Sequence, residues 1–331
     1  MSEAERTVQA RAFACEIIEG RMSDRAIADR LLSMRARGEG PEDLLGMLSV
    51  FYPQSKRVRT RHPVVMDLCG TGGAAVRTFN ISTISSFVVA AAGFPVAKHG
   101  NRSSIGRCGS ADLLEAMGAD IAPSPEVAAR MLDEIDLTFL FAPAYHPSMR
   151  TAAKARRLAA ERTIFNMMGP LMNPVLGRRR HLMGVGSLDL LEVVPPVLAE
   201  LGVERAMVVH GRPGMDEVSP CGPTLVAELR EGSVERYEIT PEELGFRPCD
   251  PASVSELSPN SAARCCYEVL RGRKGARRDA VLINSGCALF VSGKAPSLQS
   301  GVAMAERAID SGKAYEKMRE FLAASKGAAG C

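Results

Sequence analysis

The chain has 331 residues, of which 41 are Lys or Arg and 38 are Asp or Glu, so its formal net charge at pH 7 is +3. This length is sufficient for one large and one small domain, and the balanced charge argues against a nucleic-acid-binding surface. The longest apolar run, Phe87 to Ala97, is interrupted by Gly93 and Pro95 and is too short to span a bilayer.

Cysteine usage and the first residues bear on location. The nine cysteines form no C-x-x-C pair, which is typical of a reducing compartment and predicts a cytoplasmic protein. Ser2-Glu-Ala-Glu5 matches a helix capping box rather than a signal peptide. The basic runs at 56–61 and 178–180 are interpreted as solvated loops.

Three helices are expected before residue 53. In the first, apolar residues including Phe13 and Ile17 recur at helical spacing. The second follows the N-cap residue Ser23, and the third begins at Pro41, a favoured residue for the first helical turn. A basic linker, residues 54–62, then leads to a different pattern.

From residue 64 onward, short apolar runs alternate with helical patterns, which indicates a sheet with crossover helices. Residues 224–240 alternate with period two around Gly232 and predict an antiparallel hairpin at the sheet edge. The expected fold class is therefore α/β: a small N-terminal all-helical domain and a large domain with a central, mostly parallel sheet and flanking helices. The other expected strands are Val64–Leu68, Val96–Ala97, Leu137–Phe141, Leu182–Val185 and Ala206–Val209.

The first of three polar segments reads Asp67-Leu-Cys-Gly-Thr-Gly-Gly73 and follows an apolar run. Its glycines permit positive φ and leave no Cβ to block a phosphate at the backbone N–H groups. A Walker loop is excluded because no lysine follows the glycines. A dinucleotide site is excluded because residues 90–97, where its acidic residue would stand, are Ala90-Ala-Ala-Gly-Phe-Pro-Val-Ala97. A tight turn without a ligand is the alternative for these glycines alone.

The second and third segments are Thr78-Phe-Asn-Ile-Ser-Thr83 and Lys98-His-Gly-Asn-Arg102. The second precedes a helical pattern at 85–92, and a helix N-terminus favours a bound phosphate. Simple capping of that helix and a solvated basic turn are the respective alternatives. A further helix is expected to begin near Ser110. Three such segments in close succession indicate a ligand with more than one phosphate.

Taken in order, these segments resemble the anthranilate phosphoribosyltransferase family, of the nucleoside phosphorylase and phosphoribosyltransferase class. The resemblance spans nearly the whole chain, and its most specific parts are His-Gly-Asn and Asp-Glu-Val-Ser. The matching segments are Gly70–Gly73, Phe79–Thr83, Val96–Ser103, Gly109–Ala116, His146–Arg150, Arg162–Asn166, Gly169–Pro174, Val208–Gly211, Met215–Ser219, Val291–Lys294 and Ala308–Lys313.

The resemblance implies transfer of the phosphoribosyl group of 5-phosphoribosyl 1-diphosphate to the amine of anthranilate. This step of tryptophan biosynthesis gives N-(5-phosphoribosyl)anthranilate and diphosphate. The resemblance also implies a helical domain of residues 1–62 with about 149–180 added from mid-chain, and an α/β domain of residues 63–148 and 181–331. The site would lie in the cleft between them, and a homodimer would form through the helical domain.

The resemblance further assigns site residues. Those expected to bind phosphoribosyl diphosphate are Gly70, Thr71, Gly72, Gly73, Thr78, Asn80, Ile81, Ser82, Thr83, Lys98, His99, Gly100, Asn101, Arg102, Ser103, Ser104, Ile105, Gly106 and Ser110. Those expected to bind anthranilate are Gly70, His99, Asn101, His146, Arg156 and Gly169. Mg²⁺ is the expected cofactor, with two ions per site, and its expected ligands are Ser82, Asp216 and Glu217.

The chemistry of these residues suits such a reaction. Asp216 and Glu217 follow an expected strand, and adjacent acids there suit a hard cation that bridges to diphosphate, although a surface acid pair is the alternative. The fork of Arg156 can bind a carboxylate, although the neighbouring Arg157 makes a helix-surface position the alternative. The amine of anthranilate is neutral at physiological pH, so catalysis is expected to depend on positioning and leaving-group neutralisation.

Two positions depart from the family pattern. Ala74 stands where the family commonly has Asp, and Arg107 stands where it has Lys. Both leave the expected fold intact but put substrate binding in question, since lysine and arginine are not equivalent. Three other functions remain open: a phosphoribosyltransferase with another aromatic acceptor, a pyrimidine nucleoside phosphorylase, and a non-catalytic nucleic-acid-binding relative. The paired acids and the balanced charge argue against the last two.

Overall fold

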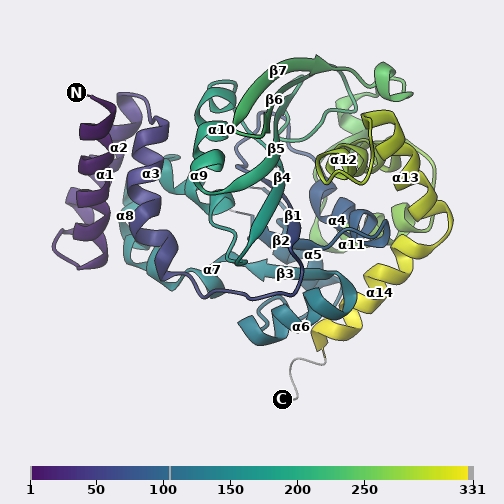
Figure 1. Ribbon diagram of the computed structural model, residues 1–331, viewed down its shortest axis with the longest axis horizontal. Coiled ribbons are helices and arrows are strands. Elements are labelled where there is room, and N and C mark those ends of the chain that lie inside the picture. The colour runs from purple at the N-terminus through teal and green to yellow at the C-terminus, as the bar shows by residue number, and fades with distance from the viewer. Residues whose placement is uncertain (1, 104–105, 327–331) are drawn as a thin grey trace.

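A computed structural model describes residues 2–103 and 106–326. Within these residues, the centre of the molecule is a seven-stranded sheet with the order β3-β2-β1-β4-β5-β6-β7 (Figure 1). The strands from β3 to β5 run parallel, and β6 and β7 add an antiparallel hairpin at one edge, as predicted. The strands are β1 (Val64–Gly70), β2 (Val96–Gly100), β3 (Leu137–Phe141), β4 (Arg178–Gly184), β5 (Val203–Gly211), β6 (Thr224–Arg230) and β7 (Ser233–Ile239).

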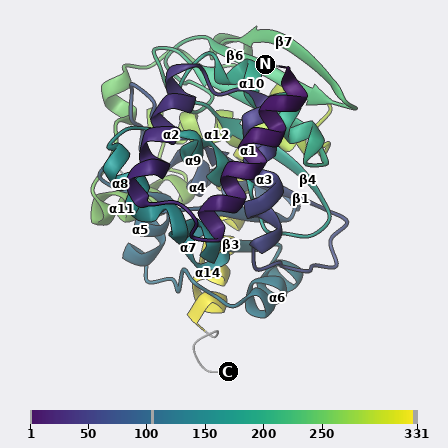
Figure 2. The same ribbon diagram turned by 90° about the vertical axis from the view of Figure 1, so that its left-hand side faces the viewer.

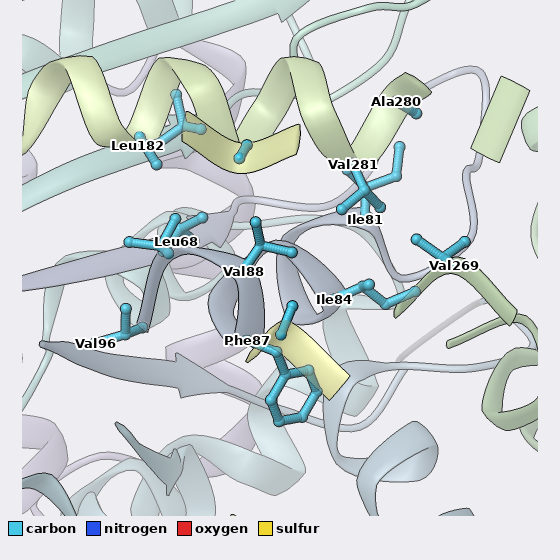
Figure 3. Packing of buried hydrophobic residues seen from close by; sticks show 14 of the residues in the cluster. Leu68, Ile81, Ile84, Phe87, Val88, Val96, Leu182, Val269, Ala280 and Val281 are labelled. Atoms are coloured by element: carbon cyan, nitrogen blue, oxygen red, sulfur yellow. The ribbon is translucent and has the colours of Figure 1, made fainter. Parts of the chain in front are cut away.

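One face of the sheet is covered by α4 (Ile81–Ala91) and α12 (Ala276–Val291). Leu68 and Leu182 of the sheet pack with Val88 and Val281 of these helices in one hydrophobic cluster (Figure 3). Because helices lie on both faces of the parallel strands, most of the strand residues are buried, including polar ones such as Asp67 and Lys98. Helices that add side chains to the same cluster are α5 (Ser110–Ala116), α11 (Pro259–Leu270), α13 (Leu298–Asp310) and α14 (Lys313–Lys326).

The other face carries a second cluster. Cys69, Met183 and Val208 alternate along their strands with residues of the first cluster and therefore point the opposite way. They pack with side chains of α10 (Leu190–Glu200) and with those of the N-terminal helices. The sheet is thus the middle layer between two apolar cores.

The three N-terminal helices lie at one end of the molecule (Figure 2). They are α1 (Glu3–Ile18), α2 (Asp24–Ala36) and α3 (Pro41–Phe51), which agree with the sequence prediction. Helix α1 packs on α3, while α2 and α3 contact two mid-chain helices, α8 (Ala153–Ala159) and α9 (Ile164–Leu171). Segments far apart in sequence therefore meet beside the sheet.

Local interactions fix the ends of these helices. Ser2 caps α1 with both bonds of a capping box, as its sequence indicated. The carboxylate of Asp43 is fully buried, but it accepts hydrogen bonds from Arg37, Arg6 and the backbone N–H of Gly40. A buried charge is tolerated when it is paired and hydrogen-bonded in this way.

The remaining helices connect strands or flank the sheet edge. No helix in the described residues is both long and apolar enough to cross a membrane. These elements are α6 (Pro125–Ile135), α7 (Ala142–Tyr145) and the 3₁₀ turns at Tyr52–Gln54, Pro147–Ala152, Glu242–Leu244 and Pro251–Val254.

Two local expectations are wrong. Residues 178–180 are the start of β4 rather than a solvated loop, and Arg179 is only 4% exposed. Its two Nη atoms donate to the carbonyls of Asn173 and Leu201 and to the hydroxyl of Tyr52, whereas its Nε has no partner among the described residues. Helix α4 begins at Ile81, four residues before the predicted start. The prediction missed its first turn because the polar residues Ser82 and Thr83 there line a cavity and interrupt the apolar pattern.

Candidate active site

A cavity of about 680 Å³ lies at the carboxyl ends of β1, β2 and β5 and extends to α8 and α9. Open parallel sheets bind their ligands at this edge. Residues that line it include most of the predicted phosphoribosyl-diphosphate set: Gly70, Thr71, Gly72, Gly73, Thr78, Asn80, Ser82, Thr83, Lys98, His99, Gly100, Asn101, Arg102, Ser103, Gly106 and Ser110. The predicted anthranilate residues His146, Arg156 and Gly169 line the same cavity.

Three residues of the predicted set differ from the others. The side chain of Ile81 is fully buried in the hydrophobic cluster beneath α4 and does not line the cavity. Its backbone N–H at the start of the helix already donates to the carbonyl of Phe79 at 2.6 Å. Ser104 and Ile105 lie outside the described residues.

The glycine loop after β1 has the backbone that its sequence predicts. Gly72 and Gly73 have φ of 63° and 77°, a region that favours glycine. Thr71 closes the loop onto the next strand: its N–H donates to the carbonyl of Gly184 at 2.9 Å, and its hydroxyl accepts from the N–H of Gly186 at 3.0 Å. The loop is therefore held open toward the cavity rather than collapsed on itself.

An arginine that sequence analysis left without a role lies against this loop. Nη2 of Arg162 donates to the carbonyl of Thr71 at 2.9 Å. A Cβ on Gly73 would lie 2.0 Å from Nη1 of Arg162, so a side chain at that position would require Arg162 to move. Arg162 stands in the recognised segment 162–166, but the spacing of residues gave no indication that it reaches the loop.

Asp216 and Glu217 meet the start of α4 across the cavity. The backbone N–H of Ser82 donates to Oε1 of Glu217 at 3.3 Å. Burial raises the pKa of Asp216, and burial together with the Asp216 charge raises the pKa of Glu217 to about 8. Two buried carboxyl groups and the Ser82 hydroxyl thus supply oxygen ligands that suit a hard divalent cation, and such a cation would favour the ionised form of both carboxyls.

Lys98 is buried beneath this group rather than solvated. Its Nζ donates to the carbonyl of Leu68 at 2.5 Å and to Oγ of Ser82 at 3.3 Å. Burial lowers the pKa of Lys98, and the nearby carboxylates Asp67 and Glu217 oppose that shift. The ammonium group therefore orients Ser82 from below.

Arg102, in contrast, is exposed and already paired. Its guanidinium donates to Asp112 at 3.0 Å and to Glu115 at 2.6 Å. The backbone N–H of Arg107 donates to Oε2 of Glu256 at 3.0 Å, and Arg107 is not among the residues lining the cavity. The side chain of Arg102 thus pairs with protein carboxylates, whereas the contact of Arg107 with Glu256 is made by its backbone.

Two histidines, His99 and His146, form a further part of the cavity wall. Nε2 of His146 lies 3.0 Å from Nε2 of His99, and Nδ1 of His146 lies 2.8 Å from Oγ of Ser55. Burial lowers the pKa of His99 well below its ordinary value and that of His146 to about 4. Both rings are therefore neutral, and His146 links Ser55 to His99 in one hydrogen-bonded row.

Arg156 faces the cavity from α8, and its guanidinium carbon is 5.4 Å from the centroid of the Phe165 ring. Its neighbour Arg157 is exposed and does not line the cavity. Burial lowers the pKa of Arg156. An anion bound there would interact more strongly with this partly desolvated guanidinium than with one in bulk water. The apolar side chains of Met149, Phe165 and Met172 also line the cavity.

A second potential metal group has weaker support. The ligand atoms of Asp67, Cys69 and His181 lie within 4.8 Å of one another. Both oxygens of Asp67 already accept hydrogen bonds, from the N–H of His99 at 3.0 Å and from Asn173 at 2.8 Å. Sequence analysis gave Asp67 no role, and the structure shows it supporting β2 and the His99 backbone.

Comparison with known proteins agrees with the geometry. A family model described as "Glycosyl transferase family, a/b domain" matches residues 62–315. An anthranilate phosphoribosyltransferase of Pelotomaculum thermopropionicum is 44% identical over 95% of this chain and 91% of its own length. One of Rubrobacter xylanophilus is 44% identical over 99% of this chain and 94% of its own.

Solved structures extend the likeness. The crystal structure of anthranilate phosphoribosyltransferase from Thermus thermophilus superposes with a TM-score of 0.89, at 35% identity over 98% of this chain and 96% of that one. The Saccharomyces cerevisiae enzyme, solved in complex with PRPP and Mg, has the same fold, with a TM-score of 0.85 at 24% identity over 99% of this chain and 94% of that one. Given its sequence identity and its fold, the chain belongs to the anthranilate phosphoribosyltransferase family.

Proposed function

We propose that this protein transfers the phosphoribosyl group of 5-phosphoribosyl 1-diphosphate to the amine of anthranilate and releases diphosphate. The observation that supports this most strongly is one cavity lined by two chemically different groups of residues. The glycine loop and the acids Asp216 and Glu217 form one group, and Arg156 with the apolar side chains of Met149, Phe165 and Met172 forms the other. The relatives that are 44% identical bear the name of this activity.

The diphosphate is assigned to the glycine loop and the N-terminus of α4. Gly72 and Gly73 have positive φ and carry no Cβ that would shield the backbone N–H groups of the loop. The start of α4 adds the positive end of a helix dipole, while the N–H groups of Ile81 and Ser82 donate to Phe79 and Glu217. These groups are fixed before the substrate arrives, so charge on the departing diphosphate meets donors that need little reorganisation.

Mg²⁺ is assigned to Ser82, Asp216 and Glu217. The donors are all oxygens, and burial, the main cause of the raised pKa of both carboxyls, would be opposed by a bound cation that favours their charged forms. Bound Mg²⁺ would supply charge neutralisation for the leaving diphosphate. Two ions per site, as the family resemblance implies, are part of this proposal.

Anthranilate is assigned to the part of the cavity around Arg156 and Phe165. Its carboxylate suits the guanidinium of Arg156, and its ring suits the apolar wall near Phe165. The residues proposed to contact it are Gly70, His99, Asn101, His146, Arg156 and Gly169.

Neither cavity histidine is assigned as a general base. His99 and His146 share one hydrogen bond, and the other ring nitrogen of His146 is bonded to Ser55. The amine of anthranilate is neutral at physiological pH and can attack without prior deprotonation. Rate enhancement is therefore proposed to come from holding the amine and C1 of the ribose together and from stabilising the leaving group.

The assembly is proposed on the same basis. Residues 1–62 with about 149–177 form the helical domain, because α2 and α3 pack on α8 and α9. Residues 63–148 and 178–331 form the α/β domain, since residues 178–180 belong to β4 and not to the helical domain as expected. A homodimer through the helical domain is part of the proposal, as the family resemblance implies. A cytoplasmic location completes the proposal.

The test is a mixing experiment that follows anthranilate fluorescence and diphosphate release together. With protein, 5-phosphoribosyl 1-diphosphate and Mg²⁺, we expect fluorescence to fall while an equal amount of diphosphate appears. Omission of any component should abolish both signals. Unchanged fluorescence would contradict the proposal, as would consumption of another aromatic amine in preference to anthranilate, or phosphorolysis of a pyrimidine nucleoside.

A further inference from the structure

Two half-buried cysteines outside the cavity lie in contact. Sγ of Cys221 is 3.4 Å from Sγ of Cys249. Cys221 belongs to the loop 212–223 between β5 and β6, which also carries Asp216 and Glu217. Cys249 follows β7 and the 3₁₀ turn Glu242–Leu244. We propose that these two cysteines are a modification site, at which a small-molecule disulfide converts the thiol pair into a reversible intramolecular disulfide.

The backbone already holds the two cysteines side by side. The N–H of Cys249 donates to the carbonyl of Pro220, the residue before Cys221, at 3.0 Å. A disulfide bond is about 2.05 Å long, so the sulfur atoms need to approach by roughly 1.4 Å. Rotation of the two side chains with a small backbone adjustment achieves this. The segments that carry Cys221 and Cys249 are therefore already adjacent before the disulfide forms.

The loop around Cys221 is rigid. Oγ of Ser219 accepts from the N–H of Cys221 at 3.0 Å, and the N–H of Ser219 donates to Thr224 at 2.9 Å. The N–H of Val218 donates to Asn284 of α12 at 3.0 Å. The thiol pair is therefore preorganised, and the acids before it are anchored independently of the sulfur atoms.

The environment also sets the order of steps. Burial and the Cys249 contact raise the pKa of the Cys221 thiol to about 12, so Cys221 stays protonated until late. The thiolate of Cys249 attacks one sulfur of glutathione disulfide and displaces one glutathione thiolate. The sulfur of Cys221 then gives its proton to solvent, attacks the Cys249 sulfur of this mixed disulfide, and displaces the second glutathione. Two protein thiols are oxidised and one glutathione disulfide is reduced to two glutathiones.

The other cysteines in the described part of the chain supply internal controls. Cys265 and Cys266 are adjacent but buried in α11, and Cys287 is buried in α12, so these three offer no accessible pair. Cys15 on α1 has an exposure similar to that of Cys221 and Cys249 but lies on a different part of the molecule. A Cys15→Ser variant is therefore matched in exposure while leaving the proposed pair intact.

The experiment exposes the full-length protein to glutathione buffers of increasing disulfide content and reads intact mass, peptide linkage and melting temperature. We expect the mass to fall by two hydrogen atoms, a Cys221–Cys249 linkage in the peptide map, and full reversal by dithiothreitol. The linked protein should melt at a higher temperature, because the crosslink restricts the unfolded chain. These readouts do not depend on catalysis.

Single variants sharpen the test. Cys221→Ser should stop at a protein with one glutathione bound on Cys249, whereas Cys15→Ser should form the linkage as the wild type does. A linkage through any other cysteines, accumulation of glutathione adducts in the wild type without ring closure, or a lower melting temperature of the linked form would each overturn the proposal.

Discussion

Nη2 of Arg162 donates a hydrogen bond to the carbonyl of Thr71 at 2.9 Å. Through this contact the segment before α9 holds the glycine loop after β1, although the two residues are 91 positions apart in sequence. The carbonyl of Arg162 in turn accepts from Nη1 of Arg35 on α2 at 2.7 Å. The position of the diphosphate loop is therefore coupled to the N-terminal helices.

Replacing Arg162 tests this coupling. Arg162→Ala removes a charge-assisted hydrogen bond, a loss on the order of 1.5–3 kcal/mol or roughly 10- to 150-fold in KM for 5-phosphoribosyl 1-diphosphate. The KM for anthranilate should change much less, because the contact is with the glycine loop. Steady-state kinetics with each substrate varied separately measures both constants. Equal increases in both would show that Arg162 merely supports the fold.

Arg156, proposed to bind the carboxylate of anthranilate, gives a second prediction. Arg156→Ala should raise the KM for anthranilate far more than that for 5-phosphoribosyl 1-diphosphate, by a similar order of 1.5–3 kcal/mol. The matched control is Arg157→Ala on the same helix, which removes an exposed arginine outside the cavity and should leave both constants unchanged. If Arg156→Ala behaves like its control, the carboxylate of anthranilate binds elsewhere.

Ala74 gives a prediction about the departure from the family pattern. Ala74 lines the cavity, and the guanidinium of Arg162 lies against the neighbouring Gly73. An added carboxylate would therefore meet loop N–H groups, a cation and Mg²⁺, so Ala74→Asp should lower the KM for 5-phosphoribosyl 1-diphosphate. Ala75→Asp adds the same charge at an exposed position outside the cavity and should not. An unchanged or higher KM in Ala74→Asp would mean that the loop binds phosphate in another arrangement.

His181 gives a prediction for stability against pH. Its ring is fully buried, neither ring nitrogen has a hydrogen-bond partner among the described residues, and burial lowers its pKa from 6.5 to about 3. Below pH 6.5 His181 is therefore protonated in the unfolded chain but remains neutral in the folded protein. The free energy of unfolding of the wild type falls as the pH falls through 6.5. Between pH 8 and pH 5 this loss is about 2 kcal/mol.

A variant isolates that contribution from the carboxyl groups. The free energy of unfolding of His181→Leu relative to the wild type should shift in favour of the variant by about 2 kcal/mol from pH 8 to pH 5. Urea denaturation of both proteins at several pH values measures it. A difference that does not vary with pH would show that His181 is protonated in the folded protein.

The strands and the glycine loop could be predicted because their signals are local, and the diphosphate-binding role of that loop stays a prediction. Apolar runs and glycines indicated the strand at residues 64–70 and the turn after it, and one segment supplied both Asp216 and Glu217. The row Ser55, His146 and His99 joins residues 91 and 47 positions apart, and no local pattern indicates such a contact.

Arginine side chains account for one wrong expectation, for a physical reason. A run of three arginines at 178–180 suggests solvent, yet the Arg179 guanidinium donates to the carbonyls of Asn173 and Leu201 inside the protein. The pairing of Arg102 with Asp112 and Glu115 was likewise not indicated by the sequence, and its expected role in phosphate binding stays a prediction. The long side chain of arginine reaches partners that sequence spacing does not reveal.

The central claim is that Asp216 and Glu217 hold the cation that assists departure of diphosphate. Its most direct measurement is the rate of anthranilate consumption across a Mg²⁺ titration for Asp216→Ala, Glu217→Ala and the surface control Glu238→Ala. We predict a folded protein in all three, turnover abolished in the first two and wild-type turnover in the control. Near-wild-type turnover at low Mg²⁺ in both Asp216→Ala and Glu217→Ala would contradict the account.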